Sequence, residues 1–310
     1  METILETRNL CRRFGGQMAV DDVSLEVRRG DVYGFLGLNG AGKTTTLRMV
    51  LGLLRPTSGT IQLFGQPALG HRRASLGRIG AMVENPAFFG QLGGAANLRH
   101  LGRLSGPVPE ERIREILELV GLADAADKKA KNYSLGMKQR LAIGLALISA
   151  PELVILDEPT NGLDPSGILE MRRLIQRLNR EQGVTFVISS HLLHEIEMTC
   201  TRVGILEEGR LVIQESLEGL MNSMHGRREL VARPADQVRG VLESFEGLTD
   251  LEATDTDGGF LFSLAESEVP SLHRALHDAG AEVYGLAERR MSLEEHFLAR
   301  AASHAKGKLS

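Results

Sequence analysis

Near the start of this 310-residue chain, an apolar strand runs directly into a glycine-rich loop and a helix. The strand is VYGFL, the loop is GLNGAGKT from Gly37 to Thr44, and the helix is expected from Lys43 to about Leu51. The loop fits G-x-x-x-x-G-K-[ST] at every fixed position, between a strand and a helix as the pattern requires. A chance match occurs on the order of once in a hundred chains of average composition, and the flanking elements argue against chance. The sequence therefore predicts a phosphate-binding loop in an α/β fold.

The residue types of this loop suit a nucleotide. Its glycines lack a Cβ, so the backbone can take unusual φ and ψ values and wrap its N–H groups around a β-phosphate. Lys43 offers a positive charge to the β- and γ-phosphates, and Thr44 offers a hydroxyl to Mg²⁺. The helix N-terminus adds about half a positive charge. The nucleotide-binding residues expected from the loop are Gly37, Leu38, Asn39, Gly40, Ala41, Gly42, Lys43, Thr44 and Thr45.

A second motif, LVILDEPTNGLD, ends an apolar strand in two adjacent carboxylates. Asp157 is expected to hold Mg²⁺, as the corresponding aspartate does in other proteins with a phosphate-binding loop. Glu158 would then lie beside the γ-phosphate and orient or deprotonate the attacking water. The alternative is that the two acids are only a solvated pair at a strand end. The phosphate-binding loop elsewhere in the chain favours the Mg²⁺ site over this alternative.

The pattern of apolar residues along the chain predicts two domains. Up to about residue 215, short apolar runs alternate with helical patterns, as expected around a largely parallel sheet. The strands expected there are Val32–Leu36, Ile79–Val83, Leu153–Leu156, Val184–Ser189 and a hairpin in GILEEGRLVIQE, with helices over Glu110–Val120 and Gln139–Ile148 and a helix end at Gly183. A helix and linker are expected over Ser216–Gly226.

The remaining residues predict a small α+β domain. Strands are expected at Glu229–Ala232, Leu248–Ala253, Phe260–Leu264 and Ala281–Leu286, with helices at Ala235–Phe245, Val269–Ala279 and Ser292–Ala301. The order β-α-β-β-α-β indicates a ferredoxin-like unit with one further helix.

Composition excludes several classes of function. The net charge is −4, and residues 221–310 hold 10 basic against 15 acidic residues, so neither part has the basic excess of a nucleic-acid-binding protein. No charge-free run reaches the roughly 18 residues of a membrane span. The N-terminus METILETRNLCRRF lacks the apolar core of a signal peptide. We expect a protein with no membrane span of its own, located in the cytoplasm.

Between the two motifs, YSLGMKQRLAIGLAL resembles the signature motif of ATP-binding-cassette (ABC) ATPases, commonly LSGGQ. Ser134 and Gly136 match, while Leu135 and Met137 depart from the usual Gly and Gln. The position, 23 residues before Asp157, strengthens the resemblance. It implies an α/β P-loop NTPase cassette over residues 1–220, with a helical signature subdomain at about 85–150, and a C-terminal α+β accessory domain over 227–310.

The resemblance also implies roles for single residues. In this family the signature binds the γ-phosphate of a nucleotide held by the other subunit, so Ser134 and Gly136 would act in trans within a homodimer. Asp164 would reach across that dimer, and His191 would contact the γ-phosphate. Phe14, in CRRFGG, matches the aromatic residue that stacks on adenine. The residues expected to carry catalysis are Lys43, Glu158 and His191, with ATP and Mg²⁺ bound.

One position departs from the family pattern. Glu84, in VENPAFF, stands where these ATPases normally have a Gln that ligates Mg²⁺ and faces the membrane partner. The resemblance therefore makes Glu84 a third candidate Mg²⁺ ligand beside Thr44 and Asp157, since a carboxylate can also bind the cation. The motifs ENPAFF, YSLGMKQR and MSLEEHFL resemble those of the bacitracin-resistance and antibiotic-exporter branch. That branch implies an ATPase on the cytoplasmic face of the membrane, driving a separate integral-membrane permease for drug or antibiotic efflux. A soluble ABC ATPase acting on ribosomes or DNA, and an importer ATPase, are the alternatives.

Overall fold

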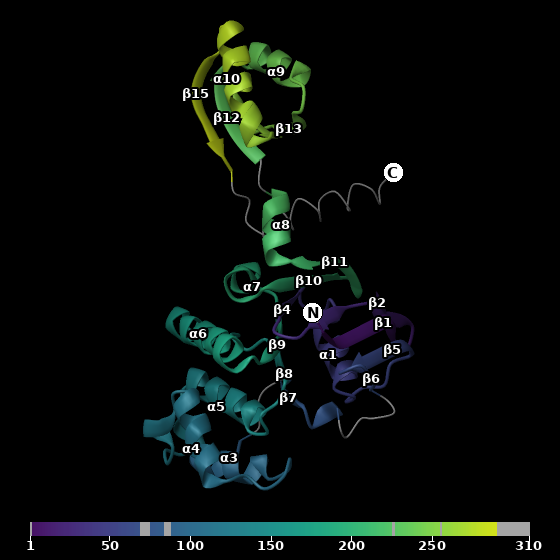
Figure 1. Cartoon of the computed structure of the whole chain (residues 1–310), viewed down its shortest axis with the longest axis vertical. Coiled ribbons are helices and arrows are strands. Elements are labelled where there is room, and N and C mark those ends of the chain that lie inside the picture. The colour runs from purple at the N-terminus through teal and green to yellow at the C-terminus, as the bar shows by residue number, and fades with distance from the viewer. Residues whose placement is uncertain (1, 69–74, 84–87, 225–226, 255, 290–310) are drawn as a thin grey trace. The chain divides into compact units, whose positions relative to one another are not determined.

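The computed structural model describes residues 2–68, 75–83, 88–224, 227–254 and 256–289. The chain forms two compact units, one ending at Leu217 and the other beginning at Glu218. Each unit has its own sheet or sheets and its own cluster of buried apolar side chains (Figure 1).

A six-stranded sheet organises the first unit. Its order is β11-β10-β4-β9-β8-β7, and all neighbours are parallel except the antiparallel pair β10 and β11. The strands are β4 (Val32–Leu36), β7 (Ile79–Met82), β8 (Leu153–Asp157), β9 (Thr185–Ser190), β10 (Arg202–Glu207) and β11 (Arg210–Ser216). Every residue of β4, β8 and β9 is buried, which is why these strands appear in the sequence as apolar runs rather than alternating patterns.

A second, antiparallel sheet precedes and follows the phosphate-binding loop in the chain. Its path is β2-β1-β5-β6, and β3 also pairs with β1. The strands are β1 (Thr3–Phe14), β2 (Gln17–Val23), β3 (Glu26–Arg28), β5 (Ser58–Leu63) and β6 (Gln66–Pro67). This sheet was not predicted from the sequence.

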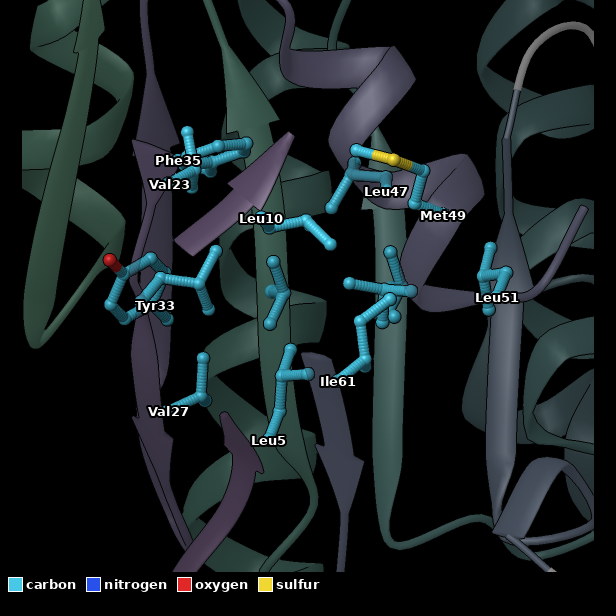
Figure 2. Packing of buried hydrophobic residues seen from close by; sticks show 14 of the residues in the cluster. Leu5, Leu10, Val23, Val27, Tyr33, Phe35, Leu47, Met49, Leu51 and Ile61 are labelled. Carbon is cyan, nitrogen blue, oxygen red and sulfur yellow. The ribbon is translucent and has the colours of Figure 1, made fainter. Parts of the chain in front are cut away.

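The main core of the first unit joins these two sheets. Leu5, Leu10 and Ile61 of the antiparallel sheet lie with Tyr33 and Phe35 of β4 in one buried cluster (Figure 2). Helix α1 (Lys43–Val50) adds Leu47 and Met49 to the same cluster. The helix that follows the phosphate-binding loop is therefore held by apolar contacts on its inner face.

Helices cover the other side of the parallel sheet (Figure 1). Two of them, α6 (Pro165–Gln182) and α7 (Leu193–Thr199), pack against β9. Three more, α3 (Gly94–Gly102), α4 (Glu110–Leu119) and α5 (Leu135–Leu147), pack on one another, and α5 also packs on β7. Short 3₁₀ helices occupy Ala123–Ala125 and Ala130–Asn132.

Two helix ends are set by local chemistry. Helix α5 begins at Leu135, earlier than the expected Gln139, because the hydroxyl of Ser134 accepts the N–H of Met137 and caps the first turn. Helix α6 ends at Gln182, and Gly183 caps it, as predicted, with a left-handed φ of 66°.

The second unit has a ferredoxin-like topology. After α8 (Leu217–Met224), its antiparallel sheet has the order β13-β14-β12-β15. The strands are β12 (Arg227–Arg233), β13 (Thr249–Ala253), β14 (Gly259–Ser263) and β15 (Glu282–Glu288), the helices are α9 (Ala235–Ser244) and α10 (Val269–Asp278), and a 3₁₀ turn covers Glu266–Glu268. The predicted β-α-β-β-α-β order is confirmed, while the helix expected over Ser292–Ala301 lies outside the described residues. Among the helices that the structure describes, none is long and apolar enough to cross a membrane.

Candidate functional site

The candidate site lies where three neighbouring parallel strands end. Leu36 of β4 pairs with Ser190 of β9, and Ser189 of β9 pairs with Asp157 of β8. Because the carboxyl ends of parallel strands meet at one edge of a sheet, the residues that follow these strands come together there. Segments far apart in the sequence thus supply one site.

The phosphate-binding loop is packed tightly against the β1–β2 hairpin. Gly42 has a φ of 103°, and a Cβ at this position would lie 2.4 Å from the carbonyl oxygen of Ala19. Ala19 is the extra residue where the pairing of β2 with β1 shifts register, between Arg12↔Val20 and Arg13↔Met18. Glycine is therefore required at position 42 both by the backbone conformation and by the close approach of the hairpin.

Lys43 is buried at the head of α1 and has several polar contacts. Its Nζ donates to the carbonyl oxygen of Gly37 at 2.6 Å and of Leu38 at 3.3 Å. The same ammonium lies 3.4 Å from Oε1 of Glu158. Only 6% of the Lys43 side chain is exposed, so these partners offset the cost of burying the charge.

Thr44 and Asp157 form an oxygen pair suited to a hard cation. The Thr44 hydroxyl donates to Oδ2 of Asp157 at 2.8 Å, and the Ser189 hydroxyl donates to Oδ1 of the same carboxylate. Carboxylate and hydroxyl oxygens are ligands that Mg²⁺ accepts, usually with waters completing its shell. These two residues therefore fit the predicted Mg²⁺ site, with Ser189 fixing the orientation of the aspartate.

Glu158 takes an unusual backbone conformation. Its φ is 51°, a left-handed value that a non-glycine residue seldom adopts, and its N–H donates to the Oγ of Ser189 at 3.0 Å. Its Oε2 lies 2.8 Å from Nδ1 of His191, while Oε1 faces Lys43. The turn thus points the carboxylate between the lysine and the histidine, and such strained residues cluster at functional sites.

An open cleft lies over the phosphate-binding loop, Glu158 and His191. Eight of the predicted site residues line it: Asn39, Gly40, Gly42, Lys43, Thr44, Thr45, Glu158 and His191. Ala19 and Asn161 also line the cleft and were missed from the sequence. Asn161 stands in the quoted TNGLD motif and could have been singled out there, whereas no local signal marks Ala19, which the hairpin brings in from another sheet.

The other predicted residues that the structure describes do not line the cleft. Gly37, Leu38 and Ala41 belong to the phosphate-binding loop itself and Asp157 bonds to Thr44, whereas Ser134, Gly136, Asp164 and Phe14 lie on other segments. Ser134 caps α5, and Asp164 caps α6 by accepting the N–H of Gly167 at 3.1 Å. A Cβ on Gly136 would lie 3.7 Å from Leu163, so the signature turn lies close to the loop that ends in Asp164. Phe14 lies at the end of β1, on the hairpin that also carries Ala19, and its side chain is half exposed. Glu84 lies outside the described residues.

Sequence comparisons agree with this geometry. Residues 20–161 match the family model described as ABC transporter. The chain is 42% identical over 300 residues to the bacitracin transport ATP-binding protein BcrA of Bacillus licheniformis, covering 96% of this chain and 97% of that protein. It belongs to the ABC transporter ATP-binding family. The resemblance drawn from the sequence motifs is thereby confirmed, and membership implies ATP hydrolysis.

Further relatives agree with the bacitracin-resistance and antibiotic-exporter branch that the motifs predict. BcrA of Enterococcus faecalis is 37% identical over 96% of this chain and 96% of its own length. The lantibiotic transport ATP-binding protein SrtF of Streptococcus pyogenes is 38% identical over 71% of this chain and 93% of its own length. Both transport relatives named for bacitracin align through the second unit as well as the first.

Solved structures confirm the predicted fold class. An ABC transporter's ATP-binding cassette in its ADP conformation matches with a TM-score of 0.65 at 26% identity, over 72% of this chain and 94% of that one. CbiO1 of Clostridium perfringens, part of the ABC transporter complex cbiONQ, matches with a TM-score of 0.65 at 27% identity, over 79% of this chain and 96% of that one.

Proposed function

We propose that this chain is the ATP-hydrolysing subunit of an ABC exporter that removes a drug or antibiotic from the cell. The observation that carries the proposal is the 42% identity to a bacitracin transport ATP-binding protein across both units. In this proposal the chain lies on the cytoplasmic face of the membrane, bound to a separate permease, and two copies close around two ATP molecules. The second unit, from Glu218 on, is then an accessory domain of the ATPase.

The cleft residues divide the chemistry among themselves. Lys43 and the N–H groups at the head of α1 neutralise and position the phosphates. Glu158 accepts a proton from, or orients, the water that attacks the γ-phosphate. His191, 2.8 Å from the Glu158 carboxylate, holds that side chain and contacts the γ-phosphate. Thr44 and Asp157 would hold Mg²⁺, which when bound neutralises charge that develops on the transferred phosphoryl group.

The signature residues act on the partner's nucleotide in this proposal. Ser134 and Gly136 do not line the cleft that contains Lys43, and Gly136 lies instead near Leu163, which precedes Asp164. An arrangement related by two-fold symmetry brings each signature turn to the other copy's cleft. Phe14 supports the adenine by stacking, which tolerates changes of base.

Hydrolysis by purified variants tests the catalytic roles. We expect Lys43→Ala to abolish ATP hydrolysis, and Glu158→Gln to lose hydrolysis while retaining an ATP-bound dimer. His191→Ala should lose most activity. His194, an exposed histidine in the first turn of α7, supplies the matched control, because His194→Ala should keep the parental activity. Hydrolysis by Glu158→Gln at the parental rate would refute the assignment of the base.

Mixing two inactive variants tests action in trans. In a two-fold dimer of Lys43→Ala with Ser134→Arg, one site keeps both an intact lysine and an intact signature. An equal mixture should then recover about a quarter of the parental sites, since half of random dimers are mixed and each has one good site. A mixture as inactive as its parents would contradict the trans arrangement.

Affinity capture tests the transport role. Glu158→Gln loaded with ATP is captured from gently solubilised membranes of the native host, and the bound proteins are identified. A hydrophobic multi-span protein supports the exporter. Capture of ribosomal or DNA-repair proteins, together with absence of the ATPase from membranes, would refute the transport role and leave the ATPase activity unaffected.

A further inference from the structure

The side chain of Arg12 lies against the aromatic ring that we assign to the nucleotide base. The guanidinium carbon of Arg12 is 4.5 Å from the centroid of the Phe14 ring and lies over its face. A guanidinium stacks well on an aromatic face because it is planar, cationic and weakly hydrated. One face of the ring is therefore covered, and a base has the opposite face to stack on.

Arg12 is also bonded to the segment that follows α1. Its Nη1 donates to the carbonyl oxygen of Arg55 at 2.7 Å. Its Nε is buried and has no hydrogen-bond partner among the described residues, so the group is held by stacking and by this one strong bond. The Arg12 guanidinium thus stacks on the Phe14 ring and at the same time donates a hydrogen bond to the backbone that follows α1.

The backbone of the same strand is attached to that segment on either side of Arg12. The N–H of Thr57 donates to the carbonyl oxygen of Cys11 at 2.8 Å, and the N–H of Arg13 donates to the hydroxyl of Thr57 at 3.0 Å. Four residues link this segment to helix α1, whose first turn carries Lys43 and Thr44. Hydrogen bonds therefore join the end of β1 to the chain that follows the phosphate-binding loop and α1, and Arg12 extends that connection to the Phe14 ring.

We propose that Arg12 is a positioning residue for the nucleotide base: it holds the half-exposed Phe14 ring in a fixed orientation relative to the phosphate-binding loop. This inference rests on the proposed role of Phe14. An exposed aromatic side chain near a strand end would otherwise change rotamer, and ordering it would lower the affinity for the base. Arg12 removes that cost before the nucleotide arrives, and it does not touch the phosphates.

The test compares a ligand that has a base with one that lacks it. Binding of ADP and of inorganic pyrophosphate, both with Mg²⁺, is measured by calorimetry on the full chain and on Arg12→Met. We expect the ADP dissociation constant to rise about fivefold, as a cation–π contact at a partly exposed site implies, while that of pyrophosphate is unchanged. Unchanged pyrophosphate binding also shows that the variant is folded.

Two further variants sharpen the measurement. Arg13→Met removes the same charge from the next residue, which is exposed, and should leave both ligands unaffected. Arg12→Lys keeps the charge but loses the planar fork, so it should behave like Arg12→Met. In a Phe14→Ala background, Arg12→Met should have no further effect on ADP, because the ring it orients is absent.

The possible failures are distinguishable. If parental ADP and pyrophosphate bind equally well, the base-stacking role of Phe14 fails and this inference fails with it. If ADP binds more tightly but Arg12→Met leaves it unchanged, or weakens pyrophosphate equally, the positioning role alone is overturned. An effect of Arg12→Met that persists undiminished in the Phe14→Ala background would overturn it as well.

Discussion

Replacing Gly42 by alanine measures how closely the phosphate-binding loop is packed against the β1–β2 hairpin. A Cβ there lies 2.4 Å from the carbonyl oxygen of Ala19, well inside the 3.4 Å of ordinary contact, so the loop or the hairpin must move. The backbone φ of 103° adds about 1–2 kcal/mol for a residue with a Cβ, and overpacking adds about 1–3 kcal/mol. We expect a loss of about 3 kcal/mol, which lowers the Tm of a unit this size by about 6–12 °C.

Gly40→Ala is the matched control for this measurement. Gly40 lies in the same loop with a φ of 84°, and no described atom lies within 4 Å of its ideal Cβ. Its replacement therefore costs only the backbone strain of about 1–2 kcal/mol. Both variants are followed by differential scanning calorimetry without nucleotide. Equal shifts in Tm would refute the claim that the close approach of the hairpin adds to the backbone strain at position 42.

Three other perturbations test contacts elsewhere in the first unit. Bonds from Arg78 and then Arg29 lower the pKa of Glu152 to about 2, so the stability it contributes is complete above about pH 5 and is lost as the pH falls towards 2. Solvent screens this carboxylate, which is about one-third exposed, so we expect Glu152→Gln to lower the free energy of unfolding by about 1 kcal/mol at pH 7 and by almost nothing near pH 2. Urea unfolding measures both values, and an equal loss at the two pH values would contradict the prediction. Arg172 and Glu195 form a largely buried ion pair between α6 and α7, so Arg172→Met should cost about 3 kcal/mol in urea unfolding, and the added change Glu195→Leu should restore most of it. No recovery in the double variant would contradict the assignment of that cost to an unpaired carboxylate. Ser189→Ala removes the hydroxyl that orients Asp157 and should lower ATPase activity about 10–100-fold at an unchanged Tm, whereas parental activity would show that the aspartate needs no such support.

The elements that could be predicted from the sequence are those whose residues lie next to one another in the chain. The strand Val32–Leu36, the loop after it and the helix from Lys43 adjoin in the chain, and the structure has β4 with the predicted bounds. Buried parallel strands such as Leu153–Asp157 are apolar throughout, so they stand out without any knowledge of their partners. The small C-terminal sheet could be predicted because its strands are separated by clear amphipathic helices.

The antiparallel sheet escaped prediction because its pattern depends on distant pairing. Strand β1 has two partners along its length besides β3, and the pairing shifts register at several points, so its apolar residues do not alternate regularly. Ala19 enters the cleft only through such a shift. The positive φ of Glu158 is likewise invisible in the sequence, because it follows from the bonds that Ser189 makes to the turn.

The order of the parallel sheet also has a consequence for synthesis of the chain. Strand β4, which carries the phosphate-binding loop, lies between β9 and β10, whose first residues are Thr185 and Arg202. As the chain leaves the ribosome, the apolar strand β4 therefore keeps the hydrogen-bonding groups of both its edges unpaired while more than half of the protein is synthesised. Translation has to pass Glu207 before both edges of β4 are paired, and until then the nascent chain depends on other protection against aggregation.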